Sequence, residues 1–139
     1  MRGVPLRLEI GPKDVAKGTV ALARRDMPGK AGKTFVPAAG AAEAVTQALR
    51  DIQTNLYQRA LAFRQANTYQ PADSEEFKQV METGWAISWW CGDAACEAAI
   101  KEDTKATTRC IPLEQPGGEG RCIRCGQPAK EVAVFARAY

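Results

Sequence analysis

The sequence predicts a mixed α/β fold, of the α+β kind, built from two small parts. Apolar and charged residues alternate near the N-terminus as they do in strands, and a long run with helical spacing begins near residue 41. Two close pairs of cysteines frame the second half of the chain. We therefore expect a partial sheet with its long helix in residues 1–67, and a small metal-stabilised α/β domain with an antiparallel sheet in residues 68–139.

The first predicted element is a strand that begins at Leu6. Leu6, Leu8 and Ile10 are apolar and alternate with Arg7 and Glu9, which predicts a half-buried strand with its two charged groups on the open face. A Gly-Pro turn at 11–14, strands at 19–24 and 33–36, and a Gly- and Pro-rich loop at 27–32 complete this region.

One long amphipathic helix follows and is expected to end before Gln70-Pro71. Its apolar residues are spaced by three or four positions, and the stripe is shorter than a dimeric coiled coil requires. We therefore favour packing of the helix on the neighbouring strands, although the coiled coil stays open. The stripe consists of Val45, Leu49, Ile52, Leu56, Ala60 and Phe63.

The second half alternates between helices and strands. Asp73 is the expected N-cap of a short helix, with Glu76 placed to accept a hydrogen bond from the preceding backbone, and the helix stops at Gly84. The remaining predicted elements are a strand at 85–90, a helix at 94–105, a strand at 106–113, a flexible loop at 115–120 and a strand at 131–139.

Four cysteines in two close pairs, Cys91 with Cys96 and Cys122 with Cys125, are able to meet at one tetrahedral metal ion. The chain contains no His, so an all-cysteine site is its only soft donor set, and such a site suits zinc. The second pair forms a Cys-x-x-Cys-Gly turn, which directs two sulfurs and several backbone N–H groups at one ion. Cys110 lies in an apolar alternation and is expected to be a buried strand residue outside the site.

Two other interpretations of these cysteines stay open. Disulfides are disfavoured because five is an odd number of cysteines and no secretory signal precedes them, which indicates a reducing compartment. A redox Cys-x-x-Cys is disfavoured because Gly-Gln-Pro follows the pair where a helix would be required. A structural zinc is the favoured interpretation.

The charge of the chain is concentrated near its N-terminus. Residues 1–38 carry eight Lys or Arg against three acidic residues, whereas the remainder carries eleven against thirteen. An anionic partner is therefore expected there, although charge alone favours an ordinary solvated face. No apolar run is long enough to span a membrane, and no phosphate loop or catalytic pairing is recognisable.

Several stretches resemble the prolyl-tRNA synthetase family. Residues 3–14 and 20–26 are similar to the end of its anticodon-binding domain. Residues 91–97, 106–112, 122–129 and 135–139 are similar to the zinc-binding C-terminal domain of its archaeal and eukaryote-like branch. The resemblance covers essentially the whole chain in the family's order.

The resemblance implies roles for particular residues. It assigns zinc to Cys91, Cys96, Cys122 and Cys125, and leaves Cys110 outside. The family's anticodon readers fall on Arg7, Lys13 and Lys33, whose cationic donors suit the N7 and O6 acceptors of guanine. The family's C-terminal Tyr falls on Tyr139, which is expected to support the active site of the complete enzyme.

The family attaches proline to tRNA(Pro) using ATP, so the resemblance implies a tRNA-binding part of an aminoacyl-tRNA synthetase. ATP and Mg²⁺ are expected only in a catalytic domain that this sequence does not contain, so the chain is expected to be inactive alone. A homodimer of the complete enzyme, a cytoplasmic location and no membrane partner are also implied. The alternative is a free-standing zinc-stabilised module that binds RNA or protein.

Overall fold

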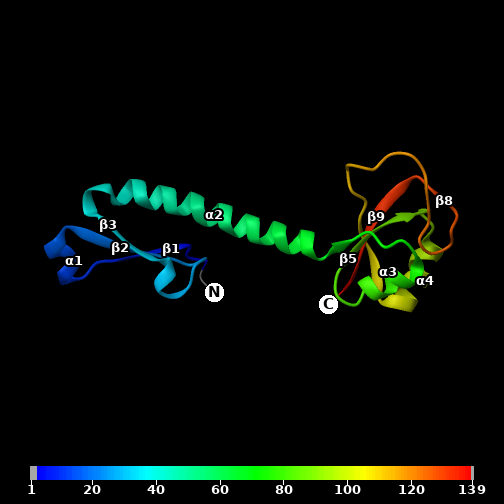
Figure 1. Cartoon of the computed structure of the whole chain (residues 1–139), viewed down its shortest axis with the longest axis horizontal. Coiled ribbons are helices and arrows are strands. Elements are labelled where there is room, and N and C mark those ends of the chain that lie inside the picture. The colour runs from blue at the N-terminus through cyan, green and yellow to red at the C-terminus, as the bar shows by residue number, and fades with distance from the viewer. Residues whose placement is uncertain (1–2, 139) are drawn as a thin grey trace. The chain divides into compact units, whose positions relative to one another are not determined.

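The computed structural model describes residues 3–138 and divides the chain into two compact units, residues 1–63 (unit 1) and 64–139 (unit 2). Helices and several sheets occur together, which confirms the predicted mixed α/β class (Figure 1). Among the described residues, no helix combines the length and the apolar character needed to cross a membrane.

Unit 1 contains an antiparallel sheet in the order β1-β2-β3. Its strands are β1 (Leu6–Glu9), β2 (Thr19–Arg24) and β3 (Lys33–Pro37), and the predicted range of β2 is confirmed. The register pairs Leu8 with Leu22 on one face, so Arg7 and Glu9 point to the opposite face. Two 3₁₀ turns, Gly29–Gly32 and Ala38–Gly40, flank β3.

A short helix, α1 (Pro12–Lys17), replaces the simple turn that the sequence predicted after β1. The Gly11 N–H donates to the Asp14 carboxylate at 2.9 Å, which stabilises the first turn of the helix. Gly18 ends the helix with φ of 64°, a left-handed conformation that glycine adopts without steric cost. Hydrogen bonds between close neighbours thus formed a helix too short for hydrophobic periodicity to reveal.

The long helix α2 (Ala41–Ala66) confirms the predicted helix, but two residues of the predicted apolar stripe are exposed, Leu49 at 41% and Phe63 at 63%. Its buried Ala48 and Ile52 accompany the buried Val20 and Leu22 of β2. Asp26 links the helix to the sheet, because its carboxylate accepts from Asn55 Nδ2 at 2.6 Å.

The exposure of β1 differs from the predicted half-buried strand. Leu8 is 48% exposed and Ile10 is 64% exposed. β1 is an edge strand, and Ile10 lies beyond Glu9, the last residue that pairs with β2. Alternation in the sequence indicated the face of each side chain but not its distance from the edge of the sheet.

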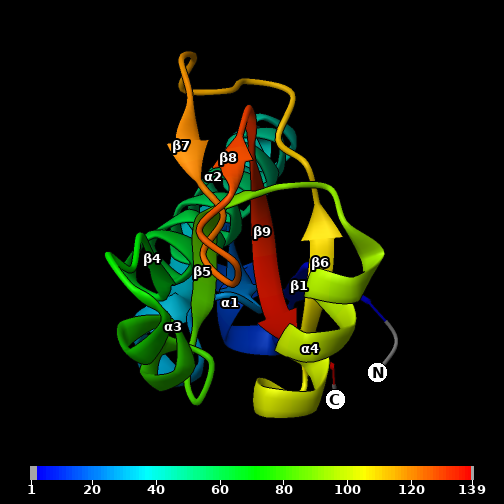
Figure 2. The same ribbon diagram turned by 90° about the vertical axis from the view of Figure 1, so that its right-hand side faces the viewer.

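Unit 2 contains a four-stranded sheet in the order β4-β5-β9-β6 (Figure 2). β4 pairs with β5 in parallel, and the other pairs are antiparallel. β7 and β8 form a separate two-stranded ribbon. The strands are β4 (Thr68–Tyr69), β5 (Trp85–Trp90), β6 (Ala106–Cys110), β7 (Gly120–Arg121), β8 (Pro128–Ala129) and β9 (Glu131–Arg137).

Two helices, α3 (Ser74–Val80) and α4 (Ala94–Thr104), complete unit 2. Asp73 caps α3 as predicted, because its carboxylate accepts from the N–H groups of Glu75 and Glu76, each at 2.9 Å. The Glu76 carboxylate accepts from the N–H of Ala72 at 2.8 Å, one residue before the N-cap.

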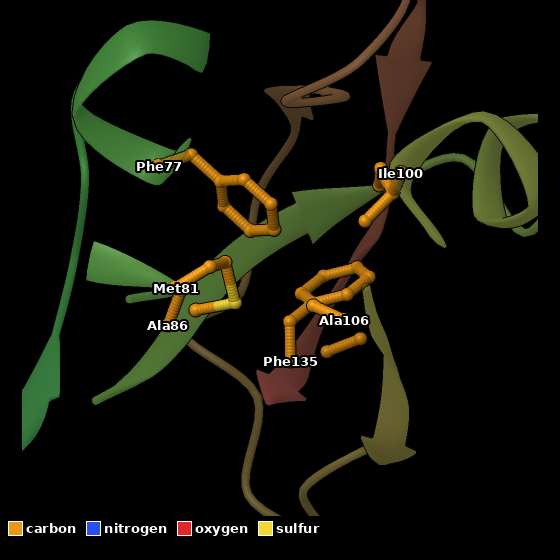
Figure 3. Packing of buried hydrophobic residues seen from close by; sticks show 7 residues of the cluster. Phe77, Met81, Ala86, Ile100, Ala106 and Phe135 are labelled. Atoms are coloured by element: carbon orange, nitrogen blue, oxygen red, sulfur yellow. The ribbon is translucent and has the colours of Figure 1, made fainter. Parts of the chain in front are cut away.

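The hydrophobic core of unit 2 joins its helices to its sheet. Figure 3 shows Phe77 of α3, Ile100 of α4 and Phe135 of β9 around a common centre. The rings of Phe77 and Phe135 pack edge to face, with centroids 5.4 Å apart. Phe135 and Met81 are the largest fully buried side chains among the described residues.

Cys110 is exposed, so the prediction of a buried strand residue was wrong. β6 is the edge strand of its sheet and ends at Cys110 instead of reaching residue 113. A register shift between Thr108 and Cys110 disturbs the alternation, and the N–H of Thr108 donates to Glu97 Oε1 at 3.0 Å.

Candidate metal centre and candidate nucleic-acid interface

The first cysteine pair lies where β5 passes into α4. Cys91 follows the last residue of β5, and Gly92 turns the chain with φ of 80°. Asp93 caps α4 by accepting from the Ala95 N–H at 2.8 Å, which places Cys96 in the first turn of the helix.

The second pair lies in the turn between β7 and β8. The Gly126 N–H donates to the Cys122 carbonyl at 2.8 Å, and the Cys122 N–H donates to the Gln127 carbonyl at 2.8 Å. The Ile123 N–H donates to the carbonyl of Trp89 at 3.0 Å, which fastens this turn to β5 beside the first pair. The two pairs are thus joined by backbone hydrogen bonding and not by sulfur alone.

The four sulfur atoms of Cys91, Cys96, Cys122 and Cys125 all lie within 4.8 Å of one another. The Sγ atoms of Cys91 and Cys125 are 3.9 Å apart. Zn–S bonds of about 2.3 Å in a tetrahedron imply sulfurs about 3.8 Å apart, so the donor set fits a four-coordinate metal ion. Cys110 is not part of this cluster.

The thiols of the cluster differ in acidity. Burial raises the pKa of Cys91 and of Cys96 above its ordinary value. Burial also acts to raise the pKa of Cys122, but backbone hydrogen bonds from Cys125 and Arg124 outweigh it and bring this pKa to about 7. Backbone N–H groups directed at a sulfur favour the thiolate, which is the form that binds a metal.

Arg7 and Lys33, two of the residues assigned to anticodon reading, lie on the same face of the unit 1 sheet. Arg7 Nη2 donates to Glu9 Oε1 at 2.6 Å, and Lys33 Nζ donates to Glu9 Oε2 at 2.5 Å. Lys13 is an exposed residue of α1, and no hydrogen bond or ion pair joins it to this group in the described part of the chain. The structure therefore brings two of the three residues together.

An open hollow of about 800 Å³ lies beside these cations. Ala23 of β2 contributes to its lining, with cationic side chains from both edge strands and from the end of β2. Its charged lining residues are Arg7, Glu9, Arg24, Arg25 and Lys33.

Sequence reasoning did not single out Glu9 or Phe35 as site residues. Phe35 is 62% exposed, and its ring centroid lies 5.7 Å from Lys33 Nζ. Alternation along β1 and β3 carries the relevant signal, because it places Glu9 beside Arg7 and Phe35 beside Lys33 on one face. Tyr139, the residue assigned to active-site support, lies outside the described residues.

Comparisons with known proteins show which proteins this chain is similar to. Residues 74–139 match the family described as "Prolyl-tRNA synthetase, C-terminal". The chain is 56% identical over its 139 residues to a proline-tRNA ligase of Chloroflexus aurantiacus and 57% identical to one of Chloroflexus aggregans. It is 43% identical over 143 aligned residues to a chloroplastic/mitochondrial proline-tRNA ligase of Arabidopsis thaliana.

All of this chain is covered in each of these matches, but it spans only 29% of the two Chloroflexus proteins and 26% of the Arabidopsis protein. The family model that matches residues 74–139 describes the C-terminal part of prolyl-tRNA synthetase. The sequence of this chain thus corresponds to the C-terminal part of proline-tRNA ligase, an aminoacyl-tRNA synthetase.

Proposed function

We propose that this chain supplies anticodon recognition and a structural zinc domain to an enzyme that attaches proline to tRNA(Pro) using ATP. Identity of 56% over all 139 residues to a proline-tRNA ligase carries this proposal. Residues 1–67 are the end of the anticodon-binding domain, and residues 68–139 are the zinc-binding domain of the archaeal and eukaryote-like branch. ATP and Mg²⁺ bind in the catalytic domain, the complete enzyme is a cytoplasmic homodimer, and Tyr139 supports its active site.

The proposed metal is zinc, held by Cys91, Cys96, Cys122 and Cys125. Four sulfurs within 4.8 Å of one another support this choice, because an all-thiolate tetrahedral set suits zinc and leaves no open position for a substrate. Zinc bound there has a structural role: it joins the start of α4 to the turn between β7 and β8.

Arg7, Lys13 and Lys33 are the proposed anticodon contacts. The grouping of Arg7 and Lys33 beside an open hollow supports their role, because RNA loops present unstacked bases and phosphates to cationic donors. Base-edge donors would recognise the guanines at the second and third anticodon positions through N7 and O6.

The test is binding of the chain to an anticodon stem-loop of tRNA(Pro), measured by fluorescence anisotropy. Arg7→Ala and Lys13→Ala are each expected to weaken binding by about 1–3 kcal/mol if each contacts a base. Lys105→Ala removes a cation from the C-terminal cap of α4 in unit 2 and serves as the matched control.

Unchanged binding in both variants would remove Arg7 and Lys13 from the site. Equal binding of the unmodified chain to unrelated RNA loops would instead favour a free-standing zinc-stabilised module. The two outcomes are distinct, because the first depends on the variants and the second on the RNA.

A further inference from the structure

Glu9 holds two cations that the proposed function directs at RNA. Its Oε1 accepts from Arg7 Nε at 2.9 Å and from Arg7 Nη2 at 2.6 Å. Its Oε2 accepts from Lys33 Nζ at 2.5 Å. Arg7 lies on the same strand, whereas Lys33 lies on β3 at the opposite edge of the sheet, so one carboxylate joins both edges.

Small residues on the central strand allow this contact. The register aligns Arg7 with Ala23 and Ala23 with Lys33, so the residue between the two cations is an alanine. The neighbouring row aligns Glu9 with Ala21. Because a methyl group is short, the long side chains of the outer strands reach across β2 and meet above it.

Stabilisation of the fold does not account for this arrangement. The side chains of Arg7, Lys33 and Glu9 are 72%, 39% and 32% exposed. Ion pairs this open to solvent contribute little to the free energy of folding. A carboxylate on a face that binds RNA also repels phosphates, so its presence there requires another explanation.

We propose that Glu9 is a positioning residue that turns Arg7 and Lys33 from phosphate binders into readers of base edges, an inference that rests on the proposed anticodon function. The carboxylate cancels part of the charge that attracts any phosphate, a contact that carries no sequence information. It also fixes the direction of both cations, whose remaining N–H groups stay available to donate to N7 and O6 of guanine.

The ionisation of Glu9 agrees with this role. Hydrogen bonds from Lys33 and then Arg7 hold the pKa of Glu9 below its ordinary value, so the carboxylate is charged at neutral pH. A charged carboxylate accepts stronger hydrogen bonds from cations than a neutral group does.

The experiment measures binding of the 139-residue chain to two RNAs over a series of salt concentrations. One is the anticodon stem-loop of tRNA(Pro), and the other carries adenines in place of the guanines at the second and third anticodon positions. Glu9→Gln is expected to bind the adenine loop more tightly, with a steeper salt dependence, because more cationic charge becomes available to phosphates. The preference for the guanine loop is the affinity for that loop divided by the affinity for the adenine loop. This ratio is expected to fall roughly tenfold, because one base-edge contact contributes about that much discrimination.

Glu75→Gln is the matched control, because Glu75 is an exposed carboxylate that pairs with Lys78 in unit 2. It makes the same change in net charge and is expected to leave the affinity ratio unchanged. Glu9→Asp keeps the charge but shortens the side chain, so it is expected to lower the ratio without increasing binding to the adenine loop.

The outcomes separate this inference from the proposed function. If the unmodified chain does not distinguish the two RNAs, the proposed function fails. If it does distinguish them and Glu9→Gln keeps the same ratio, the positioning role is overturned. Parallel loss of folding and of binding to both RNAs would also overturn it, because that pattern is the signature of a structural residue.

Discussion

Different interactions stabilise each of the two units of this chain. Unit 2 has a hydrophobic core in which Phe135 is fully buried, and a cysteine cluster beside that core. In unit 1, Arg24 and Asn55 both donate to the buried carboxylate of Asp26. Unit 1 also carries Arg7 and Lys33, two of the cations proposed to contact RNA, and the exposed ring of Phe35.

One small sheet face cannot both bind RNA and form a hydrophobic core, and the two units differ in which of these roles they serve. A face of charged and aromatic side chains binds RNA only if it stays solvated, so it adds little to folding. Unit 2 buries the rings of Phe77 and Phe135, and a metal site can supplement a core of this size.

Loss of the metal is expected to have the largest effect, and to act on unit 2. Cys122→Ser removes one of the four proposed ligands, and structural zinc supplies on the order of 10 kcal/mol of folding free energy. All three tryptophans of the chain, Trp85, Trp89 and Trp90, lie on β5, so tryptophan fluorescence reports unit 2 alone.

We expect Cys122→Ser to lose bound zinc in native mass spectrometry together with the folded fluorescence signal, while helical circular dichroism from α2 persists. Cys110→Ser is the matched control, because it changes an exposed cysteine outside the cluster. Retention of the folded fluorescence by metal-free Cys122→Ser would contradict the role of the metal in unit 2.

The next largest effect is expected from truncation of the core. Phe135→Ala removes a fully buried ring that packs on Phe77, which costs about 3–5 kcal/mol of unfolding free energy. Phe35→Ala makes the same chemical change on the exposed face of unit 1 and is expected to cost less than about 0.5 kcal/mol.

Urea unfolding followed by fluorescence measures the first variant, and circular dichroism measures the second. If Phe135→Ala and Phe35→Ala lowered the unfolding free energy equally, the contrast between the packed core of unit 2 and the solvated face of unit 1 would be contradicted.

The smallest effect is expected from acid and concerns unit 1. Hydrogen bonds from Arg24 and then Asn55 hold the pKa of Asp26 well below its ordinary value. Because the folded pKa is depressed, the stabilisation is present above the unfolded pKa of about 3.9 and is lost as the pH falls through the lower folded value.

The midpoint of thermal unfolding, followed by helical circular dichroism, is therefore expected to be constant from neutral pH down to about pH 4 and to fall below it. Asp26→Asn keeps the size of the side chain but removes its charge, so it is expected to flatten this dependence. An acid profile unchanged by Asp26→Asn would assign the effect to other carboxylates.

Local patterns in the sequence determined much of this protein. Alternation predicted the bounds of β2, a short apolar and aromatic run predicted those of β5, the apolar spacing predicted α2, and Asp73 was recognised as a cap. The two cysteine pairs, with no His in the chain, predicted an all-sulfur cluster, and the four sulfurs do lie together. These features depend on periods and spacings within a few residues, which a sequence displays directly.

Only the tertiary structure decided how distant segments meet. The hydrogen bond from Ile123 to Trp89 joins the two halves of the cysteine cluster, and the alanines of β2 allow Glu9 to reach Lys33. The exposure of Cys110 follows from its place at the end of an edge strand after a register shift. Strand order, register and edge position arise from pairing between segments far apart in the chain, so no local pattern encodes them.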